Sequence, residues 1–440
     1  MTGTALEGTM STTTPTTYAG GLTRRQAISW RNAIFIIFML PGMAMATWVS
    51  RLPAVRDTLE IRIDQVGVLI LAMAMGSIVG LVFSSHIIAR LGARTTILIG
   101  LIVLSAGLAL TGVGATVGPV FAVTWAGLFI MGFSSGITDV AMNVSGAANE
   151  RTLRKAIMPI FHAFFSFGTM LGAGLGALAE LAGVPIAVHF GALAVLVVVV
   201  TLLVIRYVQS EHGVEEGVEP VADDDHSKTW RGRLAIWKDQ RTILIGLLVL
   251  AAAFAEGSAN DWLALAMVDG HGVENATGAL VFGIFVTAMT AGRLGGVVLL
   301  NRFGRVPVLR ASFLLASAGL LVIIFVPNPI VATIGAIAWG LGSALGFPIG
   351  MSAAADDPRT AAARVSAVAT IGYFAFLVGP PVIGFLGEQV GLLGALLIVL
   401  VLCAMGAVVA SAAREPGRAS AASKAAETDT LADPGDPGTL

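Results

Sequence analysis

The chain has 440 residues, of which 56% are hydrophobic and only 12% are charged, and its formal net charge is −1. Soluble proteins carry about 25% charged residues, so this composition excludes an ordinary soluble globular protein. One cysteine excludes an intramolecular disulfide and disfavours a cysteine-based metal site, and no GxxxxGK[ST] nucleotide-binding motif is present.

Apolar runs long enough to cross a bilayer recur along the whole chain. A spanning helix needs about 20 residues, and lipid satisfies no backbone polar group, so runs of this length must be helical. The sequence predicts an all-α membrane protein with 12 transmembrane helices. They are expected at residues 33–50, 66–89, 95–113, 120–147, 157–180, 185–207, 242–268, 275–300, 306–326, 329–352, 362–387 and 390–413.

The basic residues are concentrated on one side of these helices. Of the 26 Lys and Arg, 22 lie in the N-terminal segment, in the loops that follow even-numbered helices, or in the C-terminal segment. The positive-inside rule then predicts that both termini are cytoplasmic. Residues 1–28 and 414–440 are expected to be disordered cytoplasmic tails, with no pattern of a cleavable signal peptide.

The first helix ends in the stretch MATWVSRLP, which places an aromatic and a basic residue near the outer surface. Trp48 is expected either to stack on a bound solute or to anchor the helix at the membrane interface. Arg51 either reaches the lipid headgroups or takes part in an outer gate.

A second polar group lies in the helices expected at 120–147 and 157–180. Asp139 and Asn143 are four residues apart on one helix face, and His162 lies near the same side of the membrane. A charge at the bilayer centre costs about 2.5–3.5 kcal/mol, so a carboxylate there is a functional candidate. We predict proton coupling at Asp139 and substrate binding at Asn143 and His162. The alternative is a purely structural hydrogen-bonded group.

Residues 208–241 form an acidic and then basic cytoplasmic linker between two halves of six helices, 29–207 and 242–413. The halves resemble each other: Trp48 and Trp262 are 214 residues apart, as are Trp125 and Trp339. Matches at nearly one spacing indicate a duplicated unit. Both halves are expected to start inside, so the copies are related by an axis along the membrane normal.

The seventh helix contains AFAEGSANDWL, residues 253–263, with two carboxylates and an amide. Glu256 is predicted to be a second proton-coupling residue, and Asn260, on the same face, and Trp262 are predicted to bind substrate. Asp261 is expected near the outer end, at a depth similar to that of Arg51. We predict an Arg51–Asp261 outer gate. The alternative is that Asp261 caps the helix.

Other charged residues are expected to be structural. Arg293, near the inner end of its helix, is expected to pair with Asp356 or Asp357, and Glu180 is expected to be solvated at the outer end. One set of glycines at a spacing of four is expected to allow close helix contact: Gly168, Gly172 and Gly176.

The loops ARLGAR, residues 89–94, and NRFGR, residues 301–305, are similar to the motif G-x-x-x-D-R-x-G-R of the major facilitator superfamily. In both copies the aspartate is missing, with Ala89 and Asn301 in its place. The residues that match the motif are Arg90, Gly92, Arg94, Arg302, Gly304 and Arg305. The stretch TDVAMNVSGAANE in the fourth helix also resembles the fucose-permease branch.

The resemblance covers residues 30–413 and implies two pseudo-symmetric six-helix bundles that rock about a central cavity. It also implies transport by alternating access. The mixed polar residues expected along the cavity, carboxylates, amides, His and Trp, indicate a small polar solute, and the carboxylate at Asp139 indicates coupling to protons. We therefore predict a secondary active transporter in the bacterial cytoplasmic membrane. The expected partners are a small-molecule substrate, protons and the lipid bilayer, with no nucleic acid and no cofactor, and the chain is expected to be a monomer.

Three alternatives to this function remain. The first is an exporter of a metabolite or amphipathic compound by proton antiport, although the fifth helix lacks the proline-containing motif of drug–proton antiporters. The second is a membrane-embedded transferase, and the third is a sensor that moves no solute.

Overall fold

The structure is a computed structural model that describes residues 22–153, 157–209, 236–356 and 361–415. The predicted tails fall outside this range at residues 1–21 and 416–440, and most of the predicted linker falls outside it at residues 210–235.

The first half of the chain contributes α1 to α6. Its helices are α1 (Arg24–Ser50), α2 (Leu52–Leu59), α3 (Ile63–Thr116), α4 (Phe121–Leu153), α5 (Met158–Leu181) and α6 (Ile186–Val204). The helices of the second half are α8 (Gln240–His271), α9 (Asn275–Phe303), α10 (Arg305–Phe325), α11 (Pro329–Ser343), α12 (Gly346–Ala354), α13 (Ala361–Val390), α14 (Leu392–Ala395) and α15 (Leu397–Val409).

Eleven helical segments in the described ranges are long and apolar enough to cross a membrane. One of them, α3, has 54 residues and is kinked at Gly92, where φ is 75°. At 1.5 Å per residue it is far too long for one crossing, so it supplies two. The predicted 12 transmembrane helices are therefore confirmed.

Two helices are longer than the sequence predicts because of their end caps. The side chain of Thr23 accepts from the Gln26 backbone N–H, and the Gln26 side chain accepts from Thr23, so α1 is helical from Arg24. Residues 24–28 are thus part of the helix and not of a tail. At its other end α8 continues to His271 and is terminated by Gly272, whose φ is 67°.

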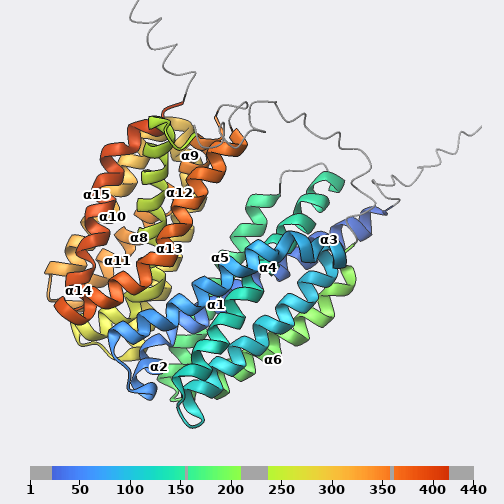
Figure 1. Ribbon diagram of the computed structural model, residues 1–440, viewed down its shortest axis with the longest axis horizontal. Coiled ribbons are helices and arrows are strands. Elements are labelled where there is room, and N and C mark those ends of the chain that lie inside the picture. The colour runs from blue at the N-terminus through green and yellow to red at the C-terminus, as the bar shows by residue number, and fades with distance from the viewer. Residues whose placement is uncertain (1–21, 154–156, 210–235, 357–360, 416–440) are drawn as a thin grey trace, which may run out of the picture.

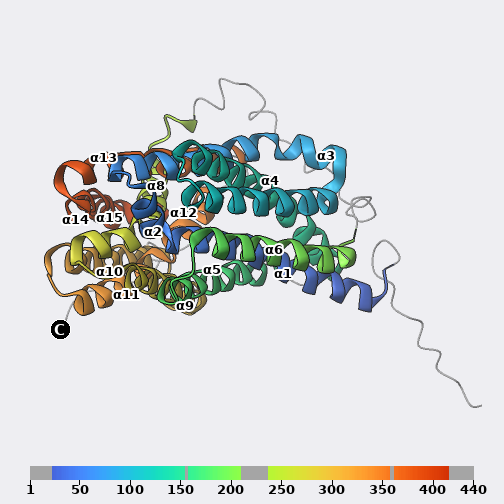
Figure 2. The same ribbon diagram turned by 90° about the horizontal axis from the view of Figure 1, so that it is seen from below.

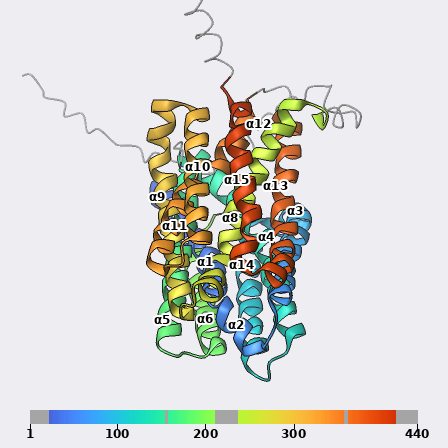
Figure 3. The ribbon, with the colours of Figure 1, turned by 90° about the vertical axis from the view of Figure 1, so that its left-hand side faces the viewer.

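The helices form two bundles, one from each half of the chain (Figure 1). The bundles meet at the end of the molecule that carries α2 and diverge toward the opposite end, where α1 begins and α15 ends. We call these the closed end and the open end. The long helices run roughly parallel to one another in both bundles (Figure 3).

The two most extensive helix contacts between the bundles are α3 with α13 and α5 with α9. In the view from below, each pair lies side by side on one face of the molecule (Figure 2). The crossing of α3 and α13 is close because it is made of small residues. A Cβ on Gly67 would lie 3.0 Å from the carbonyl oxygen of Pro380, and one on Gly384 would lie 3.1 Å from that of Ile63.

Within the first bundle, α5 packs closely against α1 through its glycines. A Cβ on Gly168 would collide with the carbonyl oxygen of Met39, and one on Gly172 would collide with that of Met43. A Cβ on Gly176 would collide with a side chain of α1. The predicted role of this glycine series in close helix packing is confirmed.

Candidate functional site

A cavity of about 210 Å³ lies between the two bundles, lined by α1, α3 and α4 on one side and by α8 and α13 on the other. Its walls are mostly apolar. Such cavities with a few converging polar groups are typical of small-molecule binding sites. The polar side chains that line it are Ser77, Ser135, Asn260, Asp261 and Tyr373.

This lining differs from the sequence-based expectation in one respect. Of the predicted substrate-binding residues, Asn260 lines the cavity, whereas Asn143, His162, Trp48 and Trp262 are not among its lining residues. Methionine and aliphatic side chains of α1, α3 and α4 occupy much of the wall, because these helices turn small and apolar residues toward the second bundle. The apolar wall residues include Met45, Met73, Ile78 and Met131.

Asp139, Asn143 and His162 come together as predicted, beside the cavity. The Asn143 amide donates to the Asp139 backbone carbonyl at 2.8 Å and to its carboxylate at 3.3 Å. His162 lies within electrostatic range of Asp139 and of Arg293 on α9. Asp139 also lies within electrostatic range of Tyr373 on α13. Asp139 and His162 are exposed, and their electrostatic interactions with Tyr373 and Arg293 cross to the opposite bundle.

Glu256 forms an ion pair with Arg293 at 2.7 Å, and the two side chains are 18% and 34% exposed. The expected pair of Arg293 with Asp356 is wrong, because Asp356 pairs with Arg241 and Arg305. Asp357, the other expected partner, lies outside the described residues. A long helical side chain points toward the N-terminus of its helix, which for α9 is the closed end. The guanidinium is therefore directed toward Glu256 and away from Asp356.

The predicted Arg51–Asp261 gate is not formed. Arg51 is only 4% exposed; its Nε lies 2.8 Å from the Glu180 carboxylate, and its Nη2 donates to the Val184 carbonyl at 2.9 Å. Glu180 is therefore paired and not simply solvated. The prediction failed because α8 continues for ten residues beyond Asp261, about 15 Å, which places this carboxylate in the cavity and not at the helix end.

A different set of polar contacts joins the bundles at the closed end. Arg56 of α2 donates to both carboxylate oxygens of Asp269 near the end of α8. The Asn275 amide at the start of α9 donates to Asp57 at 3.0 Å. Arg62 lies 3.9 Å from Glu388 of α13. We call the Arg56–Asp269 and Asp57–Asn275 contacts the closed-end clamp.

The sequence contained a signal for this clamp that the prediction overlooked. Arg51, Arg56 and Arg62 are the only basic residues expected in an outer loop. Carboxylates at the outer ends of other helices are the natural partners for these arginines, because they lie at the same depth. Asp269 in the stretch MVDGHG is such a carboxylate.

Trp48 and Trp262 are buried in packed core, with 1% and 0% of their surface exposed. The Trp262 ring lies against α13, where a Cβ on Gly384 would be 3.1 Å from it. Neither ring is exposed at the surface, so the alternative that they anchor helices at the membrane interface is wrong. Their predicted contact with a bound solute stays a prediction.

The two motif loops share a backbone conformation but differ in their ion pairs. Gly92 and Gly304 both have positive φ, 75° and 80°, which favours glycine and supports the duplication. In the second loop Arg305 lies 2.7 Å from Asp356, while Arg302 lies over the ring of Phe303. Within the described ranges no ion pair forms in the first loop at Arg90 or Arg94, which are exposed.

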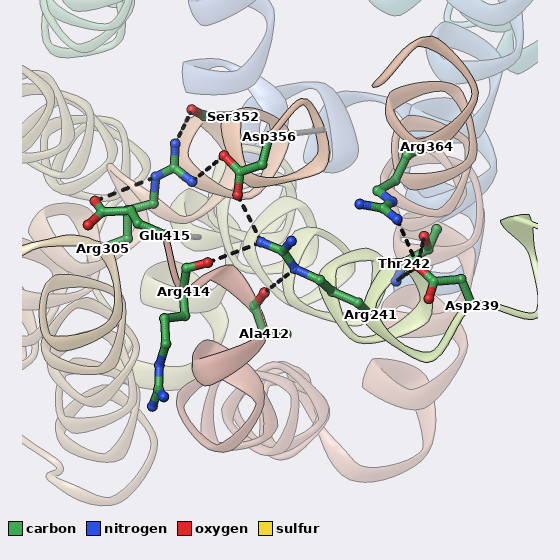
Figure 4. A network of polar contacts seen from close by, with 10 residues as sticks. All are labelled: Asp239, Arg241, Thr242, Arg305, Ser352, Asp356, Arg364, Ala412, Arg414 and Glu415. Carbon is green, nitrogen blue, oxygen red and sulfur yellow. Dashed lines mark hydrogen bonds and ion pairs between the residues drawn. The ribbon is translucent and has the colours of Figure 1, made fainter. Parts of the chain in front are cut away.

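Figure 4 shows the network around Asp356 at the open end of the second bundle. Asp356 is 8% exposed and accepts from Arg241, at the start of α8, as well as from Arg305. Arg241 also donates to the carbonyl oxygens of Ala412 and Arg414 after α15. The network therefore joins the starts of α8 and α10 to the C-terminal end of the described chain.

A neighbouring contact in Figure 4 fixes the start of α8 against α13. Arg364 lies 3.2 Å from Asp239, which caps α8 by accepting from the backbone N–H and the hydroxyl of Thr242. The hydrogen bond from the Thr242 hydroxyl, more than any other contact, lowers the pKa of the Asp239 carboxyl.

Comparison with known proteins agrees with this architecture. The family described as the Major Facilitator Superfamily matches residues 33–299 and 262–434. The chain is 30% identical over 389 residues to the transporter y4wD of Sinorhizobium fredii, covering 86% of this chain and 98% of the relative. It is 29% identical over 365 residues to an MFS-type transporter of Yersinia pestis, covering 82% and 89%.

Among solved structures, the nucleoside transporter NupG has a similar fold, with a TM-score of 0.66, 16% identity and coverage of 87% of this chain and 98% of that one. The match to the family spans far more than half of the chain, and its members are transporters and not enzymes. The chain belongs to the major facilitator superfamily and is a multi-pass membrane transporter.

Proposed function

We propose that the protein is a secondary active transporter that moves a small polar solute across the bacterial cytoplasmic membrane by alternating access, coupled to protons. The observation that carries the proposal is the cavity between the bundles, together with the contacts that join the described parts of the bundles at the closed end. A cavity lined by both halves changes its exposure when the halves rock against each other.

The proposed orientation places both termini in the cytoplasm and the closed-end clamp on the outer side. The positive-inside bias of the loops supports this orientation. The conformation is then inward-facing, and return to the outward-facing state requires the Arg56–Asp269 and Asp57–Asn275 contacts to break. We propose that the monomer is the functional unit, because each chain contains both walls of its own cavity.

Asp139 is the proposed proton-coupling residue. It faces the space between the bundles, and the neutral amide of Asn143 is the group that donates to it. Its carboxylate can therefore gain or lose a proton without breaking a direct ion pair. Glu256, the second predicted coupling residue, is already balanced by Arg293, so we propose that it exchanges a proton only when that ion pair opens.

One observation favours a second candidate, export of an amphipathic compound by proton antiport. The walls of the cavity are mainly apolar, which suits a solute with an apolar body better than a fully hydroxylated one. The two candidates share a site and differ in the direction of proton movement relative to the solute.

The test is solute-driven proton flux in proteoliposomes that contain the purified chain and a trapped pH-sensitive dye. Sugars, amino acids, nucleosides and small amines are added in turn on the outside. Import with protons acidifies the lumen, and antiport alkalinises it. The proposal is overturned if no compound changes luminal pH and none is taken up or released in parallel tracer measurements.

A further inference from the structure

The cavity contains three polar side chains whose partners are missing among the residues that the structure describes. Asn260 and Asp261 from α8 and Tyr373 from α13 line it, and no hydrogen bond or ion pair forms at any of the three within the described ranges. Polar groups that converge in a cavity without contacting each other are typical of groups that contact a ligand.

Asp261 is the most demanding of the three because its carboxylate lies among apolar walls. An ionised carboxylate in such surroundings is costly unless it carries a proton or pairs with a cation. Arg293 on the adjacent α9 is paired with Glu256. Among the residues that the structure describes, no Lys, Arg or His forms an ion pair with Asp261.

The rest of the cavity fits a compact apolar group. Met45 of α1, Met73 of α3 and Met131 of α4 face α8 across it, and the ring of Phe376 lies one turn beyond Tyr373 on α13. Methionine side chains adapt to irregular apolar shapes, and an aromatic ring also attracts a cation.

We propose that this cavity binds a small organic cation, with its ammonium group at Asp261 and its apolar body against the methionines and Phe376. An ammonium carries three donors, and the Asp261 carboxylate, the Asn260 carbonyl oxygen and the Tyr373 hydroxyl supply three acceptors. The proposal rests on the proposed transport function and narrows its solute to amines with an apolar portion.

Binding of three probes of similar shape to the purified full-length protein tests the proposal: 2-phenylethylamine, the neutral 2-phenylethanol and the anionic phenylacetate. Isothermal titration should give an affinity for the amine at least about tenfold above that for the alcohol, equivalent to about 1.4 kcal/mol. Phenylacetate should bind more weakly than either. In Asp261→Asn the preference for the amine over the alcohol should fall to within about twofold.

Matched variants separate the role of Asp261 from general damage. Asp261→Asn removes a charge that has no ion pair, so it should fold with a melting temperature no lower than that of the wild type. Asp261→Glu keeps the charge and should retain a preference for the amine. The exposed Glu274→Gln at the start of α9 also removes one carboxylate and should bind all three probes like the wild type.

Two results overturn the inference. One is equal binding of the amine and the alcohol to the wild type, and the other is an amine preference that survives in Asp261→Asn. If the amine preference is absent and low pH stabilises the wild type but not Asp261→Asn, the carboxylate carries a proton instead. The binding test and the flux test are independent. A missing amine preference would not affect the measurement of solute-driven proton flux, and a missing proton flux would not affect the measured affinities.

Discussion

At the scale of single residues, the two predicted proton-coupling carboxylates have different partners. The Asn143 amide donates to Asp139, which lies within electrostatic range of His162 and Tyr373, whereas Glu256 forms an ion pair with Arg293. Within the described residues no direct ion pair forms at Asp139. A substitution at either carboxylate therefore tests a different contact.

Removing the charge of Asp139 should uncouple transport from pH. In Asp139→Asn we expect exchange of solute at equilibrium to continue, and uptake driven by a proton gradient to fall at least about tenfold, because the amide at position 139 cannot carry the proton. The measurement compares counterflow with gradient-driven flux in proteoliposomes. Transport that is equally insensitive to pH in the wild type and the variant would eliminate Asp139 as the coupling residue.

Breaking the Glu256–Arg293 pair should cost stability as well as transport. Either Glu256→Gln or Arg293→Gln leaves one charge unpaired inside the bundle, at a cost of about 1–3 kcal/mol. The double variant removes both charges and should recover most of the loss in melting temperature. Additive losses in the double variant would mean that the two side chains do not stabilise each other.

At the scale of elements, the close contact of α1 and α5 depends on glycine at particular positions. Gly172→Ala should lower the melting temperature and the yield of folded protein, because the added Cβ meets the Met43 carbonyl oxygen and neither helix backbone can yield without moving its neighbours. Gly174→Ala is the matched control, since nothing lies within 4 Å of its added Cβ. It should be neutral or slightly stabilising. Equal effects of the two changes would refute this account of the helix contact.

The closed-end clamp joins α2 to α8 through the opposite charges of Arg56 and Asp269. Exchanging these two side chains should therefore preserve the attraction. Arg56→Asp alone places two like charges together and should favour the outward-facing state, as should Asp269→Arg alone. The combined exchange should restore the wild-type balance. We would measure the labelling of Ser135→Cys from outside with an impermeant thiol reagent in a Cys403→Ser background. Labelling unchanged by either single variant would exclude the clamp as a determinant of conformation.

At the scale of the whole molecule, transport by rocking requires the bundles to separate at the closed end. Cysteines at positions 56 and 269, joined through disulfide bonds by a short bis-methanethiosulfonate reagent, should abolish transport, and reduction of those disulfides should restore it. A link within one bundle, between positions 239 and 364, should leave transport largely intact. Full activity with positions 56 and 269 joined would contradict alternating access by these bundles.

Much of this architecture can be predicted from the sequence, because each transmembrane helix is a long apolar run and the basic residues recur in alternate loops. Twelve apolar runs and the shared spacing of Trp48 and Trp262 predicted the helices and the duplicated bundles. The site was harder. Asp139 and Asn143 lie four residues apart on one helix, so their contact was predictable, and Asn260 was correctly placed in the cavity.

Contacts between helices were not predictable in the same way. Depth along a helix suggested that Arg51 meets Asp261, but depth says nothing about rotation about the helix axis or about which neighbour lies within reach. Glu180, on the adjacent α5, is the partner of Arg51. The orientation of Arg293 toward Glu256 likewise depends on side-chain direction and on the neighbouring helix, which sequence spacing alone does not contain.

The uneven reinforcement of the two halves has a consequence for how the molecule works. Arg241 and Arg305 converge on Asp356 and tie the last helix to the first helix of the second half, whereas Arg90 and Arg94 in the duplicate loop have no ion pair in the described structure. The two copies of the repeated unit thus differ in the ion pairs of their motif loops, as far as the described residues show. We expect the second bundle to move as a rigid body during transport and the first bundle to undergo more internal rearrangement.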